Sequence, residues 1–86
     1  MARSYAFHSA TGASDFLGLR TGRKGQTEIV YDDGVARRMV WRVTDPNEDP
    51  ARLHDALHRA VNQPRVVPAL YAELKRQAIA IEIVAG

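Results

Sequence analysis

Two histidines four residues apart are the first candidates for chemistry in this sequence. His54 and His58 have the i, i+4 spacing at which two imidazoles on one helix can reach a single metal ion. The glutamate of the H-E-x-x-H pattern is absent, because Asp55 follows the first histidine. A third ligand would have to come from His8, which is far away in the sequence. We therefore expect surface histidines beside an apolar helix stripe and predict no metal site.

A glycine-rich stretch with two basic residues is the second candidate. Gly18, Gly22 and Gly25 give the spacing G-x-x-x-G-x-x-G, and Arg23 and Lys24 lie between the last two glycines. Phosphate-binding loops have G-x-G-x-x-G or G-x-x-x-x-G-K-[ST] between a strand and a helix, and this stretch matches neither pattern. We interpret it as a turn between strands and predict no nucleotide or other cofactor.

The sequence offers no nucleophile with a recognisable partner. The absence of cysteine excludes a thiolate nucleophile, a disulfide framework and cysteine-ligated metal centres. All three serines lie within the first fourteen residues, and none stands in a G-x-S-x-G elbow. We therefore predict that the protein is not an enzyme and assign no catalytic residue.

Basic residues between positions 20 and 42 form the most suggestive group, and Tyr31 and Trp41 lie among them. The residues that we predict to contact a partner are Arg20, Arg23, Lys24, Arg38 and Arg42. Because arginine is favoured at protein interfaces, we expect an accessory, adaptor or inhibitor protein that binds another protein through an arginine-rich sheet and hairpin face. The alternative is nucleic-acid binding without sequence preference through the same residues, and the plain interpretation is a solvated sheet face. Sheet edges also make self-association an option.

The charge distribution favours the first half of the chain as the part that binds a partner. Twelve basic and ten acidic residues give a net charge of +2, with +3 in residues 1–43 and −1 in residues 44–86. There is no run of five like charges, and so small an excess does not by itself indicate nucleic acid.

Length and composition indicate a single small domain over residues 1–86. The chain is 45% hydrophobic, which suits a folded core, and a domain usually has roughly 100–150 residues. No apolar run approaches the roughly 20 residues of a membrane span, and no signal-peptide block follows the first residues. We expect no membrane partner and, from the missing cysteines, a cytoplasmic location.

The first half of the chain predicts strands. Tyr5 and Phe7 alternate within a strand over 4–10, and a second strand covers 16–20. Residues 26–43 predict a hairpin with a three-residue loop, Asp32 to Gly34, in which Gly34 is left-handed. This register makes the cross-strand pairs Tyr31–Val35, Thr27–Met39 and Glu28–Arg38, puts Trp41 on the apolar face, and leaves Arg37 beside Ile29 on that face.

The second half predicts two helices and a final strand. The first helix has Asp49 as its expected N-cap and Pro50 as its first residue. It ends at residues 62–64, which include a proline. The second helix begins at or just before Pro68, and its apolar stripe consists of Val67, Leu70, Tyr71, Leu74 and Ala78. Isoleucines at every second position from Ile79 predict the strand.

These elements predict an α+β fold. We expect a mainly antiparallel sheet of four or five strands in the order β-β-β-β-α-α-β, with both helices packed on one face. The N-terminal strand could lie beside the C-terminal one.

Overall fold

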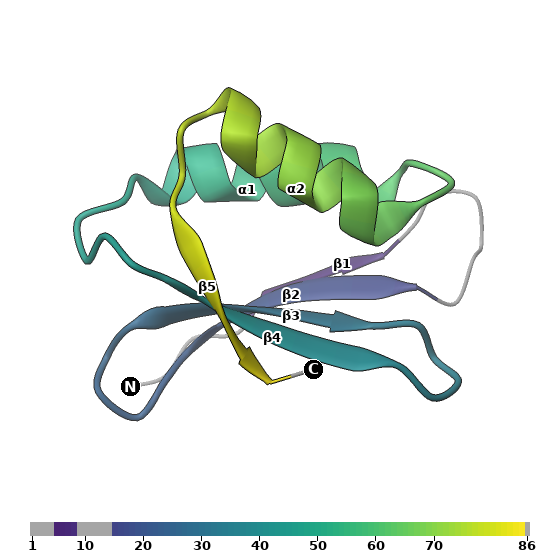
Figure 1. The fold of residues 1–86 in the computed structure, drawn as a ribbon, viewed down its shortest axis with the longest axis horizontal. Coiled ribbons are helices and arrows are strands. Elements are labelled where there is room, and N and C mark those ends of the chain that lie inside the picture. Colours follow the sequence, from purple (N-terminus) through teal and green to yellow (C-terminus); the bar gives the residue numbers. More distant parts are fainter. Residues whose placement is uncertain (1–4, 9–14, 86) are drawn as a thin grey trace.

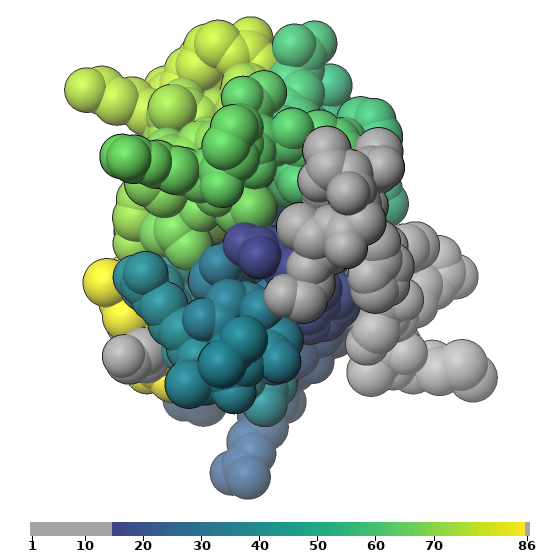
Figure 2. All heavy atoms as spheres, turned by 90° about the vertical axis from the view of Figure 1, so that its right-hand side faces the viewer, coloured from purple at the N-terminus to yellow at the C-terminus, as the bar shows by residue number. Residues whose placement is uncertain are grey.

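The structure, a computed structural model, describes residues 15–85 with their side chains and residues 5–8 by their backbone. The strands are β1 (Tyr5–His8), β2 (Phe16–Thr21), β3 (Thr27–Asp32), β4 (Arg38–Val43) and β5 (Ile81–Ala85), and the helices are α1 (Pro50–Val61) and α2 (Val66–Arg76). All neighbouring strands are antiparallel, in the order β1-β2-β3-β4-β5. Both helices lie on one face of the sheet (Figure 1), and the side view shows them as a separate layer above the strands (Figure 2). The predicted α+β fold is confirmed.

The two terminal strands do not lie side by side, so that expectation is wrong. β1 pairs with β2 and β5 pairs with β4, which places them at opposite edges of the sheet. Short connections make consecutive strands neighbours, and the chain therefore fills the sheet in order from β1 to β4. After the helices it returns beside β4, where the Thr44 N–H donates to the Ala80 carbonyl at 3.1 Å.

The predicted hairpin has the correct faces and the wrong register. Asp32 opposes Arg38 and Glu28 opposes Arg42, so the loop spans residues 33–37 rather than 32–34. The pairing therefore differs by four positions, and an even shift returns every side chain to the same face. Gly34 is left-handed as predicted, with φ of 78°.

The Asp33 side chain explains the longer loop. Its Oδ1 atom accepts hydrogen bonds from the backbone N–H groups of Val35, Ala36 and Arg37 at 2.8, 3.0 and 3.0 Å. Such hydrogen bonds, led by the one from Val35, lower the pKa of the Asp33 carboxyl. The wider loop also exposes Arg37 and places Trp41 opposite Ile29. An apolar pair thus replaces the buried arginine that the shorter loop would have required.

Trp41 lies at the centre of the core between sheet and helices, as predicted. Its side chain is fully buried, and its indole N–H donates to the Tyr71 hydroxyl at 3.0 Å. The two rings meet edge to face with centroids 5.8 Å apart. In residues 15–85, the other large, fully buried side chains are Leu17, Ile29, Leu57, Leu70, Leu74 and Val61.

Tyr31 extends the core toward the end of the sheet at which the β3–β4 loop lies. Its hydroxyl donates to the Asp15 carboxylate at 2.7 Å, which ties the end of β3 to the residue before β2. Burial and this hydrogen bond raise the pKa of Tyr31 to about 12. The phenol is therefore neutral at physiological pH.

Two expectations about the start of α1 are correct, and one about the end of α2 is wrong. The Asp49 side chain accepts from the Ala51 N–H at 2.9 Å, and Pro50 begins α1, both as predicted. Ala78 was expected to continue the stripe of α2, but it lies beyond the helix with a left-handed φ of 56°. The Ala78 N–H bonds to the Lys75 carbonyl and the Ile79 N–H to the Leu74 carbonyl, the pattern of a Schellman cap. This cap turns the chain into β5.

Replacing Ala78 with glycine should stabilise the protein by about 0.5–1 kcal/mol. A left-handed alanine costs roughly 1–2 kcal/mol, and glycine removes that cost while adding some entropy to the unfolded chain. Urea unfolding followed by circular dichroism measures the change. The control is Ala72→Gly in the exposed middle of α2, which should destabilise by about 1 kcal/mol. Equal effects of the two substitutions would contradict a left-handed Ala78.

Candidate interaction surface

The sheet face turned away from the helices carries a row of four charges. Successive side chains of a strand point to opposite faces, so the residues flanking the buried core positions lie on this uncovered face. The strand register aligns Arg20 with Glu28, Glu28 with Arg42, and Arg42 with Glu82. These four residues, one from each of β2 to β5, are here called the charge row. Their signs alternate across the sheet.

Ion pairs hold both arginines of the charge row. Arg20 Nε lies 2.8 Å from Glu28 Oε1, and Arg42 pairs with Glu82. Glu28 is only 7% exposed, and its other carboxylate oxygen accepts from Gln26 Nε2 at 3.3 Å. The charges of two predicted partner-binding residues are therefore balanced within the chain. Sequence spacing could not identify these pairs, because both depend on strand register.

The other predicted residues lie at the two ends of the sheet. Arg23 and Lys24 are exposed in the turn between β2 and β3. The charge row lies closer to this end of the sheet than to the other end. Arg38 is exposed at the start of β4, in register with Asp32, and is about 13 Å along the strand from Arg42. The structure thus brings Arg20, Arg42 and the turn together and places Arg38 apart from them.

The turn itself is closed by hydrogen bonds. The Gly22 N–H donates to the Gln26 carbonyl at 2.7 Å, and the Lys24 N–H donates to Gln26 Oε1 at 3.0 Å. Gly25 adopts φ of 79°, which favours glycine. Gln26 therefore links this turn to Glu28 of the charge row, and Arg23 and Lys24 project from a fixed backbone. The prediction of a hairpin turn here is confirmed.

An apolar strip runs between the charges of the uncovered face. Gly18, Val30 and Val40 are aligned across β2, β3 and β4. The two valines are each only 5% exposed, so the centre of this face offers a partner almost no apolar surface, although no described helix covers it. The charge row lies on one side of this strip, and Asp32 and Arg38 lie on the other. Among the described side chains of this face, three arginines are therefore balanced by three acidic residues.

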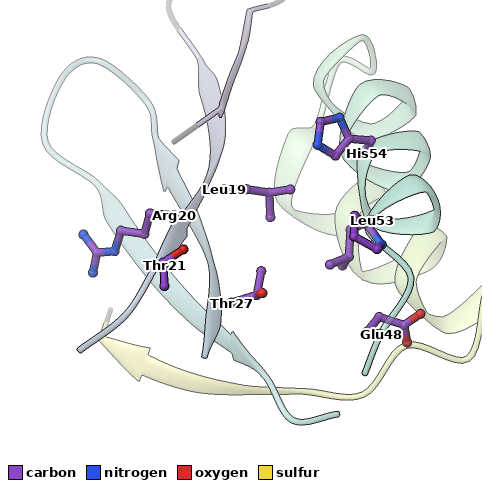
Figure 3. A pocket seen from close by; sticks show the side chains of 8 residues that line it. Leu19, Arg20, Thr21, Thr27, Glu48, Leu53 and His54 are labelled. Atoms are coloured by element: carbon purple, nitrogen blue, oxygen red, sulfur yellow. The ribbon is translucent and has the colours of Figure 1, made fainter. Parts of the chain in front are cut away.

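A hollow of about 310 Å³ opens between the start of α1 and the turn end of the sheet (Figure 3). Its lining includes Leu19, Thr21, Thr27, Glu48, Leu53 and His54. Arg20 also contributes to the lining, and its guanidinium end points away from α1 (Figure 3). Glu48 pairs with Arg52 at 3.1 Å, so its carboxylate is already engaged. The hollow combines the leucine side chains with two threonine hydroxyls and the imidazole of His54, and this lining can hold a small group with apolar and polar parts.

His54 and His58 lie on α1, four residues apart. His58 is exposed, and His54 is half-buried at the rim of the hollow. Across residues 15–85, no three histidine, aspartate or glutamate side chains are close enough together to hold a metal ion. The side chain of His8 lies outside the described residues.

Comparison with known proteins gives no relative. No family model matches the chain, and neither a curated protein nor a solved structure resembles it significantly. Among the described residues, neither helix has the length and apolarity that crossing a bilayer requires.

Proposed function

We propose that this chain is a small non-catalytic protein-binding domain, acting as an accessory, adaptor or inhibitor protein through its uncovered sheet face. The observation that supports this is the one-sided sheet: α1 and α2 cover one face, and in the described part of the chain no helix covers the other. The proposed contacts are Arg20, Arg23, Lys24, Arg38 and Arg42. Guanidinium groups on a rigid sheet suit recognition of carboxylates on a partner.

The arrangement of charges favours a protein over a nucleic acid as the partner. A phosphate backbone is uniformly negative and would meet Glu28, Asp32 and Glu82 as well as the arginines. A protein surface can present both signs in a matching pattern, which gives specificity more than raw affinity. Arg23 and Lys24 add positive charge only at the turn.

Reversing the charge of Arg38 tests the proposal. Arg38→Glu places a second acid next to Asp32 on the partner-facing side, and we expect partner affinity to fall roughly tenfold or more. The matched control is Arg65→Glu, which makes the same charge change at an exposed position before α2, on the helix layer. The measurement is affinity capture from the native cell extract with quantitative mass spectrometry, followed by titration of the captured protein.

The expected outcome is a set of proteins retained by the unchanged chain and by Arg65→Glu and lost with Arg38→Glu. Equal retention by all three chains would overturn the proposal. So would a mobility shift of both RNA and DNA that weakens steeply with salt and is lost in Arg42→Glu, since that result indicates nucleic-acid binding.

A further inference from the structure

The charges of the uncovered face alternate in sign along the charge row. From β2 to β5 the row consists of Arg20, Glu28, Arg42 and Glu82, which is positive, negative, positive, negative. In the opposite direction the same row is negative, positive, negative, positive. A reversed copy of the row therefore places the opposite charge at every position.

A second row on this face has the same property. Asp32 of β3 and Arg38 of β4 are in register, on the other side of the valine strip from the charge row. Reversal about a line between β3 and β4 exchanges these two positions and sets each residue against the opposite charge. The same line also reverses the charge row, because two of its four residues lie on either side.

One two-fold axis produces this reversal when two such sheets meet face to face. An axis that is parallel to the strands and midway between β3 and β4 keeps each row at its own level and exchanges the strands on its two sides. It sets every charge of both rows against the opposite charge of the second copy, in the pairs Arg20–Glu82, Glu28–Arg42 and Asp32–Arg38. An axis along β3 would instead oppose Arg20 to Arg42 and Glu28 to its own copy, which are like charges.

We propose that a second copy of this chain binds the uncovered sheet face in this arrangement. The inference rests on the proposed function, because it names the partner of the same face. A different protein would need a matching pattern of six charges, whereas a second copy supplies that pattern by symmetry. Complementary charges across an interface select the partner and its register, and opposed like charges exclude other arrangements.

The exposure of the side chains decides which of these pairs make most of the contact. The side chains of Arg20 and Glu82 are 40% and 47% exposed, and Arg38 is also exposed. The ion pair within the chain uses Nε of Arg20, and a guanidinium has five N–H donors, so Arg20 can bind a second carboxylate. Glu28 is only 7% exposed, so the Arg20–Glu82 and Asp32–Arg38 pairs would make most of the contact.

A dimer of this kind should be weak and sensitive to salt. Val30 and Val40 lie between the two rows and are each 5% exposed, so the interface gains little from apolar burial. Ion pairs near the surface are screened by salt. We expect sedimentation velocity of the unchanged chain to show reversible dimerisation at low salt and a dissociation constant that rises roughly tenfold at high salt.

Two charge reversals test the arrangement, because each one alone removes the complementarity and the two together restore it. Arg38→Glu opposes two acids at two places in the dimer, and Asp32→Lys opposes two bases. Each variant alone should therefore dimerise roughly tenfold more weakly, or less. In a mixed pair, the two introduced charges face each other, and Asp32 of one chain faces Arg38 of the other. We expect a fluorescently labelled Asp32→Lys chain to be monomeric alone and to form dimers when Arg38→Glu is added.

Arg65→Glu is the matched control, since it makes the same charge change at an exposed position on the helix layer. It retains Arg38, which repels the lysine of the labelled chain, so it should bind that chain more weakly than Arg38→Glu does. Asp32 also accepts from the Gly34 N–H at 2.7 Å, so circular dichroism is needed to show that Asp32→Lys is folded. If it is not, comparison of the unchanged chain with Arg38→Glu decides.

Three results would overturn the dimer. They are a monomer at every concentration in low salt, a dimer that Arg38→Glu leaves unchanged, and equal binding of the folded labelled chain to Arg38→Glu and Arg65→Glu. The proposed function fails separately from this inference. Capture of a different protein that is lost with Arg38→Glu supports the proposed function even where the chain by itself is monomeric.

Discussion

Replacing Trp41 with alanine should lower the free energy of unfolding by roughly 3–5 kcal/mol, which is the cost of a large aromatic truncation in a core. Trp41 is fully buried between the sheet and α2. An 86-residue domain has a total stability of only roughly 4–13 kcal/mol, so this single change should leave the protein marginally folded or unfolded.

Urea unfolding followed by far-ultraviolet circular dichroism measures this loss. Fluorescence cannot serve, because Trp41 is the only tryptophan in the chain. Tyr71→Phe is the matched control, since it removes the hydroxyl that accepts from the indole and keeps the ring contact. It should cost about 1 kcal/mol. An unchanged unfolding midpoint for Trp41→Ala would show that Trp41 is not a core residue.

Replacing Glu28 with alanine should cost about 2–3 kcal/mol, the second-largest effect. Removing one member of a buried ion pair leaves the other charge without its counterion, which costs about 3–5 kcal/mol when both are buried. Arg20 is 40% exposed and can partly recover its hydration, so we expect a smaller loss. The turn would also lose the hydrogen bond from Gln26.

Glu82→Ala is the control for Glu28→Ala, because Glu82 belongs to the same charge row and pairs with Arg42 at the surface. The Glu82 side chain is 47% exposed, whereas the side chain of Glu28, taken without its backbone, is 9% exposed. An exposed ion pair contributes less than about 1 kcal/mol, so we expect a small change in the same urea titration. Equal losses for the two variants would contradict the burial of Glu28.

The Glu28→Ala and Arg38→Glu experiments separate the contribution of the uncovered face to stability from its role in binding. Glu28 and Arg20 connect β2 and β3 near the turn, so Arg20 supports the sheet in addition to any contact with a partner. Arg38 does not belong to the charge row, so it is the better residue with which to test binding.

The sequence alone predicted the parts of this fold that depend on local chemistry. Side-chain alternation identified both faces of the β3–β4 hairpin, and Asp49 with Pro50 marked the start of α1, because capping and amphipathic period are properties of neighbouring residues. The burial of Trp41 followed from the same alternation. The expected layer of two helices on one sheet face was also correct.

Only the tertiary structure decided how distant residues pair. Asp33 capped a wider loop and moved the hairpin register by four positions, which placed Glu28 opposite Arg42 rather than Arg38. β5 entered beside β4 and brought Glu82 to Arg42, and the left-handed Ala78 ended α2 earlier than its apolar stripe suggested. The arginines of this segment thus lie on a sheet face where, among the described side chains, acidic residues balance them, because ion pairs form across strands and strand register is set by the whole fold.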